Sequence, residues 1–185
     1  MFKMIVAMSQ KRGIGYKNTL PWLSLSKDMK YFKNKTIGKG NNCVVMGRNT
    51  WESLGVTKKE PLPKRDKIIM SRSIDNIDMA RTSIAKNMDE VFRLCDKKKY
   101  DEVWVIGGEE IYKLFIDEDQ LEEIYITEIQ RDYKCDTFFP KLSDSFFLSH
   151  TTETAWEKNI GFRFTKWEKK DILQLELIGN GMHPF

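Results

Sequence analysis

One aspartate and one aromatic residue share a face of a predicted helix, and together they could bind a ligand. Asp28 and Phe32 are four residues apart with Met29 beside them, and the neighbouring lysines point toward water. A carboxylate on the apolar side of a helix is costly unless a partner pairs with it. One interpretation is helix capping, because Asp28 lies in the first turn, where the helix dipole favours negative charge. The other is a buried carboxylate that binds a planar edge with two adjacent N–H donors.

Three glycine-containing segments follow predicted strands, where ligands bind in open α/β sheets. They are residues 7–22, which contain Gly13-Ile14-Gly15, residues 46–50 (MGRNT) and residues 106–110 (IGGEE). Glycine lets backbone N–H groups approach a phosphate, although a plain turn is the alternative at each position. None of the segments completes GxGxxG or a Walker A loop, which argues against an ordinary Rossmann dinucleotide site and a P-loop kinase.

Histidine and cysteine are scarce, which excludes several kinds of chemistry. Cys43, Cys95 and Cys135 form no CxxC pair, so we expect buried free thiols in a reducing, cytoplasmic compartment and no disulfide framework. His150 and His183 fit neither HExxH nor a nucleophile motif. We therefore expect no metal site, and we expect any acid–base chemistry to depend on a carboxylate.

Length and charge narrow the class of protein further. A chain of 185 residues with 41% hydrophobic residues suits one globular domain. No apolar run approaches the ~20 residues of a membrane-spanning helix, and residues 4–8 are too few for a signal-peptide core, so we expect a soluble protein without membrane contact. The 31 Lys and Arg residues lie among 27 Asp and Glu residues, and this favours a solvated surface over a nucleic-acid-binding face.

Strand-like and helix-like segments alternate along most of the chain and must position these residues. Predicted strands cover residues 2–7, 43–46, 68–70, 103–106, 124–129, 146–156 and 162–167. Predicted helices, the first of them capped by Ser26, cover residues 26–35, 50–54, 88–97 and 110–116, and a long loop covers residues 8–25. This order predicts a single-domain α/β fold with a mostly parallel central sheet, an antiparallel C-terminal edge and flanking helices.

Short motifs in a fixed order resemble those of one family. They are residues 5–7 (IVA), 13–15 (GIG), 20–22 (LPW), Asp28 with Phe32, 45–51 (VMGRNTW), 61–65 (PLPKR), 71–72 (SR), 105–108 (VIGG) with Tyr112, Thr127, and 136–140 (DTFFP). From Met4 to about Lys170 the chain resembles dihydrofolate reductase in its longer, animal-type form. The resemblance implies a domain over residues 1–170 with an extension over residues 171–185. It also implies NADPH-dependent reduction of 7,8-dihydrofolate to tetrahydrofolate, sensitivity to antifolates and a role in one-carbon metabolism and thymidylate synthesis.

The resemblance assigns substrate-binding and catalytic roles. Asp28 would bind the 2-amino group and N3 of the pterin and polarise the ring while a water protonates N5. Trp22 would position that water, Leu20 would help to close the site, and Tyr112 would lie near the nicotinamide. Arg65 would hold the α-carboxylate of the glutamate tail. The other residues expected to bind the substrate are Ile5, Val6, Ala7, Met29, Phe32, Lys33, Leu54, Ile106 and Thr127.

The resemblance also assigns the NADPH site. Arg48 would meet the phosphates, and Ser71 with Arg72 would recognise the 2′-phosphate, with added charge from Lys86. The other residues expected to bind NADPH are Ala7, Gly13, Ile14, Gly15, Asn18, Thr19, Gly47, Asn49, Thr50, Ser73, Gly107, Gly108, Glu109, Glu110, Ile111 and Tyr112. Residues 107 and 108 match a glycine pair that a cis peptide joins in the family.

Two departures from the family and two alternative functions remain. Glu109 and Glu110 replace small or neutral residues, and we expect both to face solvent. In the tail, apolar and polar residues alternate as in a strand over residues 172–178 (ILQLELI), with Leu173, Leu175 and Leu177. This pattern predicts either an added edge strand or a dimer contact. We expect a monomer, and a dimer through the tail is the alternative. The NADPH-dependent reductase of riboflavin synthesis should lack the pattern of Asp28, Phe32 and Arg65. An RNA-binding regulator is a secondary alternative, because members of this family bind RNA.

Overall fold

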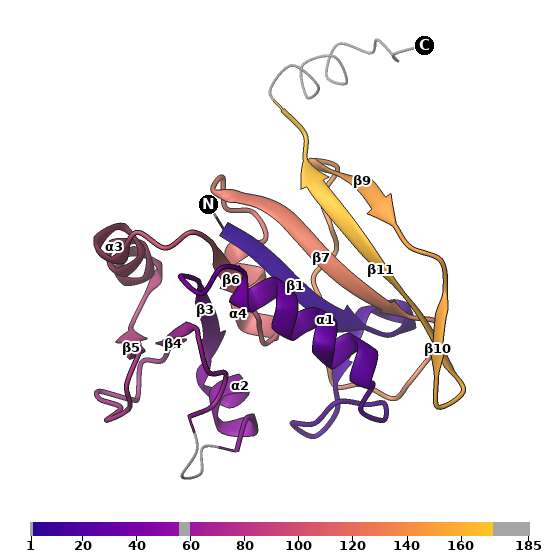
Figure 1. Ribbon diagram of the computed structural model, residues 1–185, viewed down its shortest axis with the longest axis horizontal. Coiled ribbons are helices and arrows are strands. Elements are labelled where there is room, and N and C mark those ends of the chain that lie inside the picture. Colours follow the sequence, from indigo (N-terminus) through magenta and orange to yellow (C-terminus); the bar gives the residue numbers. More distant parts are fainter. Residues whose placement is uncertain (1, 56–59, 172–185) are drawn as a thin grey trace.

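Apolar strands that are buried on both faces build the centre of the molecule. The computed structural model describes residues 2–55 and 60–171, so the predicted strand over residues 172–178 lies outside the described residues. One nine-stranded sheet has the order β10-β11-β7-β1-β6-β3-β4-β5, with β9 also paired to β11 (Figure 1). Its strands are β1 (Phe2–Met8), β3 (Cys43–Gly47), β4 (Asp66–Met70), β5 (Thr82–Ala85), β6 (Val103–Val105), β7 (Leu121–Ile129), β9 (Phe146–Thr151), β10 (Ala155–Glu157) and β11 (Ile160–Lys169).

The direction of the strands confirms the predicted sheet. All the pairings from β5 across to β7 are parallel. Strand β11 runs antiparallel to β7, β9 and β10. The chain is therefore a single-domain α/β protein with a mostly parallel sheet and an antiparallel C-terminal edge.

The helices cover both faces of the sheet, because successive side chains of a strand point to opposite sides. On one face, Ile5 and Val44 pack with side chains of α1 (Ser26–Ile37) and α2 (Arg48–Ser53). On the other face, Met4 and Val45 pack with side chains of α3 (Met88–Lys98) and α4 (Glu109–Phe115). Helix α1 crosses in front of β1 in Figure 1.

The predicted loop over residues 8–25 is wrong in part, because short elements form within it. A 3-10 helix covers Gln10–Arg12, and β2 (Gly13–Gly15) pairs with β8 (Thr137–Phe138) in a separate two-stranded sheet. After this pair, Trp22 and Leu25 are buried against β7 and β11 in a third apolar cluster. The loop that precedes α1 is thus anchored at both ends.

Three further predictions need correction. Strand β5 (Thr82–Ala85) was not predicted, because only two of its four residues are apolar and it lies at the sheet edge. The predicted strand over residues 146–156 is two strands, β9 and β10, and the backbone and side chain of Thr152 between them bond the backbone of Phe164. Of the three free cysteines, only Cys43 is fully buried, whereas Cys95 and Cys135 are partly exposed.

Candidate active site

The carboxyl ends of the parallel strands bring the predicted site residues to one edge of the sheet. Ala7 and Thr127 face each other in register across β1 and β7. Gly47 ends β3, and its N–H donates to the carbonyl oxygen of Gly107 after β6 at 2.8 Å. Ser71 directly follows β4. Because parallel strands end at the same edge, motifs far apart in the sequence meet here.

Asp28 lies over this edge and bonds to the sheet. Its Oδ1 accepts a hydrogen bond of 2.7 Å from the hydroxyl of Thr127. Burial raises the pKa of Asp28 above its ordinary value, the Thr127 hydrogen bond opposes this, and the negative charge of Glu157 adds to the rise. Asp28 lies in the first turn of α1, as the capping interpretation expects, but Glu157 and not Asp28 accepts from the N–H groups of Ser26 and Lys27. The predicted Ser26 cap is wrong: Leu25 is the N-cap residue and forms no side-chain bond.

The residues around Asp28 form a partly open apolar site. Phe32 and Leu54 are half-buried and pack against the cluster that contains Ile5. Met29 has 52% of its surface exposed, and Lys33 is also exposed. These two residues therefore stand at the outer side of α1 and not within the packed core.

Tyr112 is buried beneath this site and binds the backbone of β1. Its hydroxyl donates a hydrogen bond of 2.8 Å to the carbonyl oxygen of Ile5, and burial raises its pKa well above the ordinary value. A Cβ atom on Gly107 would lie 3.0 Å from the Tyr112 ring, so only glycine allows this approach without displacement. The peptide between Gly107 and Gly108 is cis.

Arg65 places a buried guanidinium beside α1. Its Nε donates to the carbonyl oxygen of Pro63 at 3.1 Å, and its Nη1 donates to the Thr36 hydroxyl at 2.8 Å. The Thr36 hydroxyl in turn donates to the carbonyl oxygen of Phe32 at 2.8 Å. Burial lowers the pKa of Arg65, and within the described part of the chain no carboxylate lies at ion-pair distance from it. This arrangement suits an external carboxylate.

Thr36 was not among the predicted site residues, although a signal for it exists. Asp28, Phe32 and Thr36 follow one another at intervals of four residues, so they share one face of α1. A fully buried polar residue at the third position of such a series indicates a bonding role, and Thr36 has that burial.

Arg48 and the turn after β4 form a polar cluster at the predicted cofactor site. Arg48 Nη1 donates to the Ser73 hydroxyl at 2.9 Å. The hydroxyl of Ser71, which is buried, accepts from the backbone N–H groups of Ser73 and Ile74. Lys86 donates to the carbonyl oxygen of Ile74 at 2.6 Å and to the Asp75 carboxylate at 2.7 Å. Lys86 therefore holds the turn, and its ammonium is already bound.

The start of α4 differs from expectation at one residue. Glu110 faces solvent, with 82% of its side chain exposed, but Glu109 has only 24% exposed. Lys113 lies 3.4 Å from Glu109 and 3.2 Å from Glu110. The expectation that both carboxylates face solvent is therefore wrong for Glu109, which is partly covered and paired with a lysine one turn away.

The loop before α1 carries Leu20 and Trp22 in different environments. Leu20 has 49% of its surface exposed, whereas Trp22 is buried with its ring 5.9 Å from that of Tyr133. The loop is held by Asp136, whose N–H donates to the carbonyl oxygen of Gly15 and whose carboxylate accepts from the N–H of Lys17, both at 2.9 Å. A Cβ atom on Gly15 would overlap the Thr137 hydroxyl.

The remaining predicted residues vary in exposure. Val6, Gly13 and Ile111 are buried. The half-buried ones are Ala7, Ile14, Thr50, Ile106 and Gly108, and the exposed ones are Asn18, Thr19, Asn49 and Arg72.

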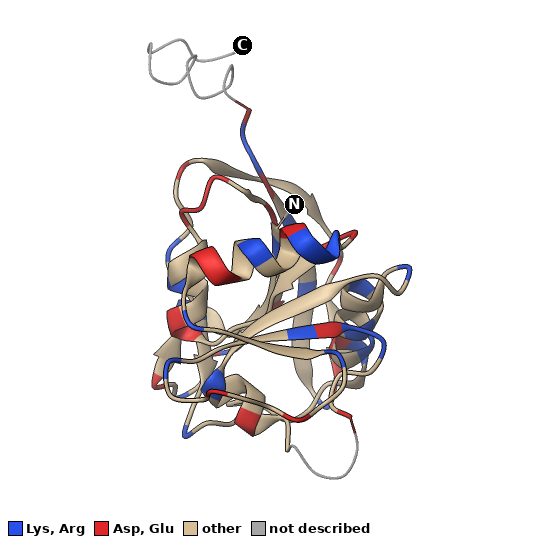
Figure 2. Cartoon of the chain, turned by 90° about the vertical axis from the view of Figure 1, so that its left-hand side faces the viewer, with Lys and Arg blue, Asp and Glu red and all other residues tan. Residues whose placement is uncertain are grey.

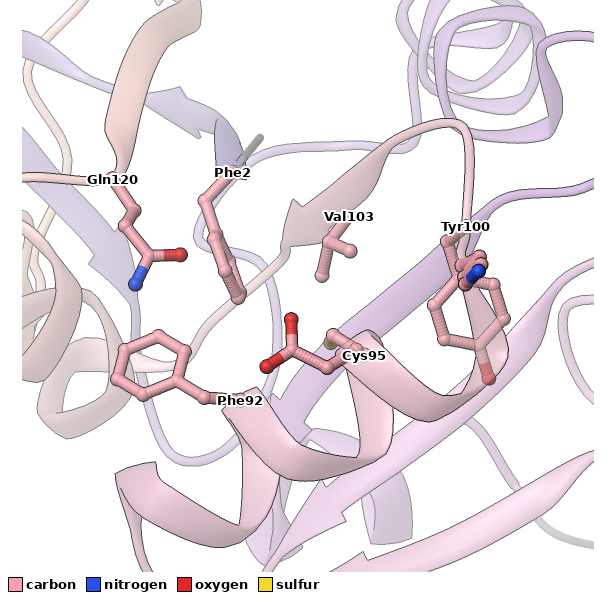
Figure 3. Close-up of a pocket in the computed structure, with 8 residues that line it drawn as sticks. Phe2, Phe92, Cys95, Tyr100, Val103 and Gln120 are labelled. Atoms are coloured by element: carbon pink, nitrogen blue, oxygen red, sulfur yellow. The ribbon is translucent and has the colours of Figure 1, made fainter.

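A cavity at the opposite edge of the sheet is separate from this site. It has a volume of about 320 Å³, and the rings of Phe2 and Phe92 and the amide of Gln120 face it (Figure 3). Phe2 and Val103 begin strands β1 and β6, so the cavity lies at their amino ends. None of the predicted site residues lines it.

Charge and metal-binding groups do not define another site in the part of the chain that the structure describes. Lys and Arg residues lie beside Asp and Glu residues on the same elements in the view of Figure 2. Over residues 2–55 and 60–171, no group of three His, Cys, Asp or Glu residues could hold a metal ion. Within those residues, no helix is both long enough and apolar enough to span a membrane.

Comparison with known proteins gives one consistent family. The chain is 34% identical to dihydrofolate reductase of Mus musculus over 90% of this chain and 96% of that protein. It is 31% identical to the viral dihydrofolate reductase of Saimiriine herpesvirus 2 over 91% of this chain and 85% of that protein. It is 35% identical to the bifunctional dihydrofolate reductase-thymidylate synthase of Daucus carota over 90% of this chain and 33% of that protein. The family model for dihydrofolate reductase matches residues 1–169, and the chain belongs to the dihydrofolate reductase family.

Proposed function

We propose that this protein reduces 7,8-dihydrofolate to 5,6,7,8-tetrahydrofolate with NADPH as the hydride donor. Its membership of the family and the names of its relatives support this proposal. The observation that carries it is the partly buried carboxylate of Asp28, which is bonded through Oδ1 to Thr127 at the carboxyl edge of the sheet. Among the described residues, no hydrogen bond to Oδ2 and no cation pairs with this carboxylate, so it suits a ligand edge with two N–H donors.

Two polar groups at opposite ends of one face of α1 suit an elongated substrate. Asp28 lies in the first turn, and Thr36, which binds Arg65, lies eight residues later. Eight residues of helix span roughly 12 Å. An N–H-rich pterin at Asp28 and a carboxylate at Arg65 would therefore bind at separate points, with Phe32 and Leu54 along the apolar part between them. The same pattern argues against a reductase of riboflavin synthesis.

The residues after β3 and β4 fit an anionic, phosphorylated nicotinamide dinucleotide. Hydrogen bonds join Arg48 to Ser73 and Ser73 to Ser71. Arg72, which is exposed, lies between the two serines in the sequence. A Cβ atom on Gly108 would lie 3.5 Å from the Thr50 hydroxyl, so the backbone after β6 closely approaches α2. We propose that these residues bind NADPH, which when bound supplies the hydride that is added to pterin C6.

Protein groups would orient the pterin and control the proton. Asp28 would bind and polarise the ring, and a water near Trp22 would protonate N5, with Leu20 limiting access of bulk water. The Tyr112 hydroxyl donates a hydrogen bond to the Ile5 carbonyl oxygen, and its pKa is raised. Tyr112 would therefore act as a positioning residue and not as an acid. Glu109 and Glu110, neutralised in part by Lys113, would not repel the phosphates.

The wider role follows from the same site. We propose a cytoplasmic monomer whose product supports one-carbon metabolism and thymidylate synthesis. Antifolates with an amidine-like edge would bind at Asp28. Residues 1–170 would form the catalytic unit.

The substitution Asp28→Asn tests the proposed function. It removes the negative charge that binds and polarises the pterin, so turnover of dihydrofolate should fall roughly a hundredfold or more. The affinity for NADPH, measured by quenching of protein fluorescence, should not change. Asp144→Asn is the matched control, because Asp144 is exposed and forms no ion pair with another described residue. Full turnover in Asp28→Asn would contradict the proposal.

A further inference from the structure

The helix that carries Asp28 is capped from a distant part of the chain. Its N-cap residue, Leu25, has no polar side chain to bond the free N–H groups of the first turn. Glu157, at the end of β10, supplies both oxygens instead. Oε1 accepts from the N–H of Ser26 at 2.7 Å, and Oε2 accepts from the N–H of Lys27 at 3.1 Å. Asp28 is the next residue.

The turn between β10 and β11 adds further contacts to the same segment. Lys158 Nζ donates to the carbonyl oxygen of Ser24 at 2.5 Å. Lys27 Nζ reaches the carbonyl oxygen of Trp156 at 3.5 Å. Beneath these bonds, Leu25 packs in the apolar cluster with Ile160. The position of the first turn of α1 is therefore set by β10 and β11.

We propose that Glu157 is a positioning residue for Asp28: it fixes the first turn of α1 and acts on the Asp28 carboxyl through its negative charge. This inference rests on the proposed function, in which Asp28 binds the N–H edge of the pterin. Glu157 binds the backbone N–H groups of Ser26 and Lys27. It acts through the first turn of α1, so its role requires no contact with substrate.

The groups that act on the Asp28 carboxyl come from three elements. Thr127 of β7 donates a hydrogen bond, Glu157 of β10 brings a like charge, and Tyr31 is the titratable neighbour on α1 itself. Burial raises the pKa of Asp28, Thr127 lowers it, and Glu157 raises it further. The N–H groups of Ser26 and Lys27 lower the pKa of Glu157 and so favour its ionised form. Loss of the charge on Glu157 should therefore lower the pKa of Asp28.

Two substitutions separate the charge of Glu157 from its geometry. Glu157→Gln removes the charge and replaces one acceptor oxygen by an amide donor, whereas Glu157→Asp keeps the charge on a shorter side chain. Glu153→Gln is the matched control, since Glu153 is exposed between β9 and β10 and its side chain bonds no described residue of α1. If Glu157→Gln does not fold, Glu157→Asp still tests the geometry.

The readout is the titration of the Asp28 carboxyl carbon, followed by NMR in the unliganded protein. In Glu157→Gln the midpoint should move to lower pH, and the amides of residues 26–28 should exchange faster. The KM for dihydrofolate should rise roughly two- to fivefold, as expected for loss of a helix cap, with unchanged NADPH affinity. Glu157→Asp should retain the Asp28 midpoint, and Glu153→Gln should change nothing.

An Asp28 midpoint that does not move in Glu157→Gln, or that moves equally in Glu153→Gln, would overturn the inference. Because the titration needs no turnover, the two proposals fail separately. A shifted midpoint in a protein that does not reduce dihydrofolate would refute the proposed function and support the coupling of the two carboxylates. Normal reduction with an unshifted midpoint would refute the coupling alone.

Discussion

The guanidinium of Arg65 is buried, and over residues 2–55 and 60–171 its hydrogen-bond acceptors are all neutral. The carbonyl oxygen of Pro63 and the hydroxyl of Thr36 fix the plane of the group. Its other N–H donors are then oriented before a ligand arrives. A planar, fixed fork of this kind binds a carboxylate through two parallel hydrogen bonds.

Replacing Arg65 with lysine should weaken the binding of the glutamate tail selectively. A lysine keeps the charge but loses the fork, so the KM for dihydrofolate should rise roughly 10- to 100-fold, as hydrogen bonds to charged groups are lost. Steady-state kinetics measure this. Dihydropteroate, which lacks the glutamate, should show an unchanged KM in the same variant. An equal rise for both substrates would show that Arg65 acts on the fold and not on the tail.

Single residues were predictable from the sequence where their own type and spacing carry the chemistry. The helical spacing of Asp28 and Phe32 indicated a shared face, and the family motif indicated Arg65. The same spacing places Thr36 on that face, but the bonds that Thr36 and Glu157 form were not predictable in this way. Their partners, Arg65 and Ser26, lie 29 and 131 residues away, so the contacts exist only in the folded chain.

At the scale of elements, α1 is attached to the sheet by polar bonds at both ends. Thr127 and Glu157 hold its first turn, and the bond between Thr36 and Arg65 holds its last turn. The helix is mostly polar on its outer side, with Lys27, Lys30 and Lys33 all exposed. Its position over the site therefore depends on a few specific contacts.

The substitution Thr36→Val should loosen the second of these attachments. Valine has a similar shape but leaves a buried N–H of Arg65 unpaired, which should lower the free energy of unfolding by about 1–3 kcal/mol. Urea denaturation measures the change. Thr36→Ser, which keeps the hydroxyl, should lose much less stability. Equal losses in the two variants would mean that the methyl group and not the hydrogen bond matters.

The sequence predicted buried elements better than edge elements, for a physical reason. Strand β3, whose first four residues are fully buried, forms from a continuous apolar run. Strand β5 is a four-residue edge strand with only two apolar side chains, and β2 forms by pairing with β8. Such segments take their structure from a neighbour, so local pattern does not indicate them.

At the scale of the whole molecule, the parallel sheet explains why the site forms. Several proposed substrate residues lie on α1, β1 and β7, and several proposed cofactor residues follow β3, β4 and β6. The sheet order places β1 between β7 and β6, with Ala7 near the end of β1 and the Gly107–Gly108 peptide after β6. The order of motifs predicted the fold, but the bonds between the groups, such as that from Tyr112 to Ile5, required the structure.

The central claim is that this edge of the sheet brings a hydride donor and the pterin together. The most direct test uses NADPH labelled with deuterium at C4, unlabelled dihydrofolate and the wild-type protein, with the product analysed by NMR and mass spectrometry. We predict that NADPH is oxidised only when dihydrofolate is present, and that the tetrahydrofolate formed carries deuterium at C6. Absence of dihydrofolate-dependent oxidation, or a product without deuterium at C6, would contradict the account.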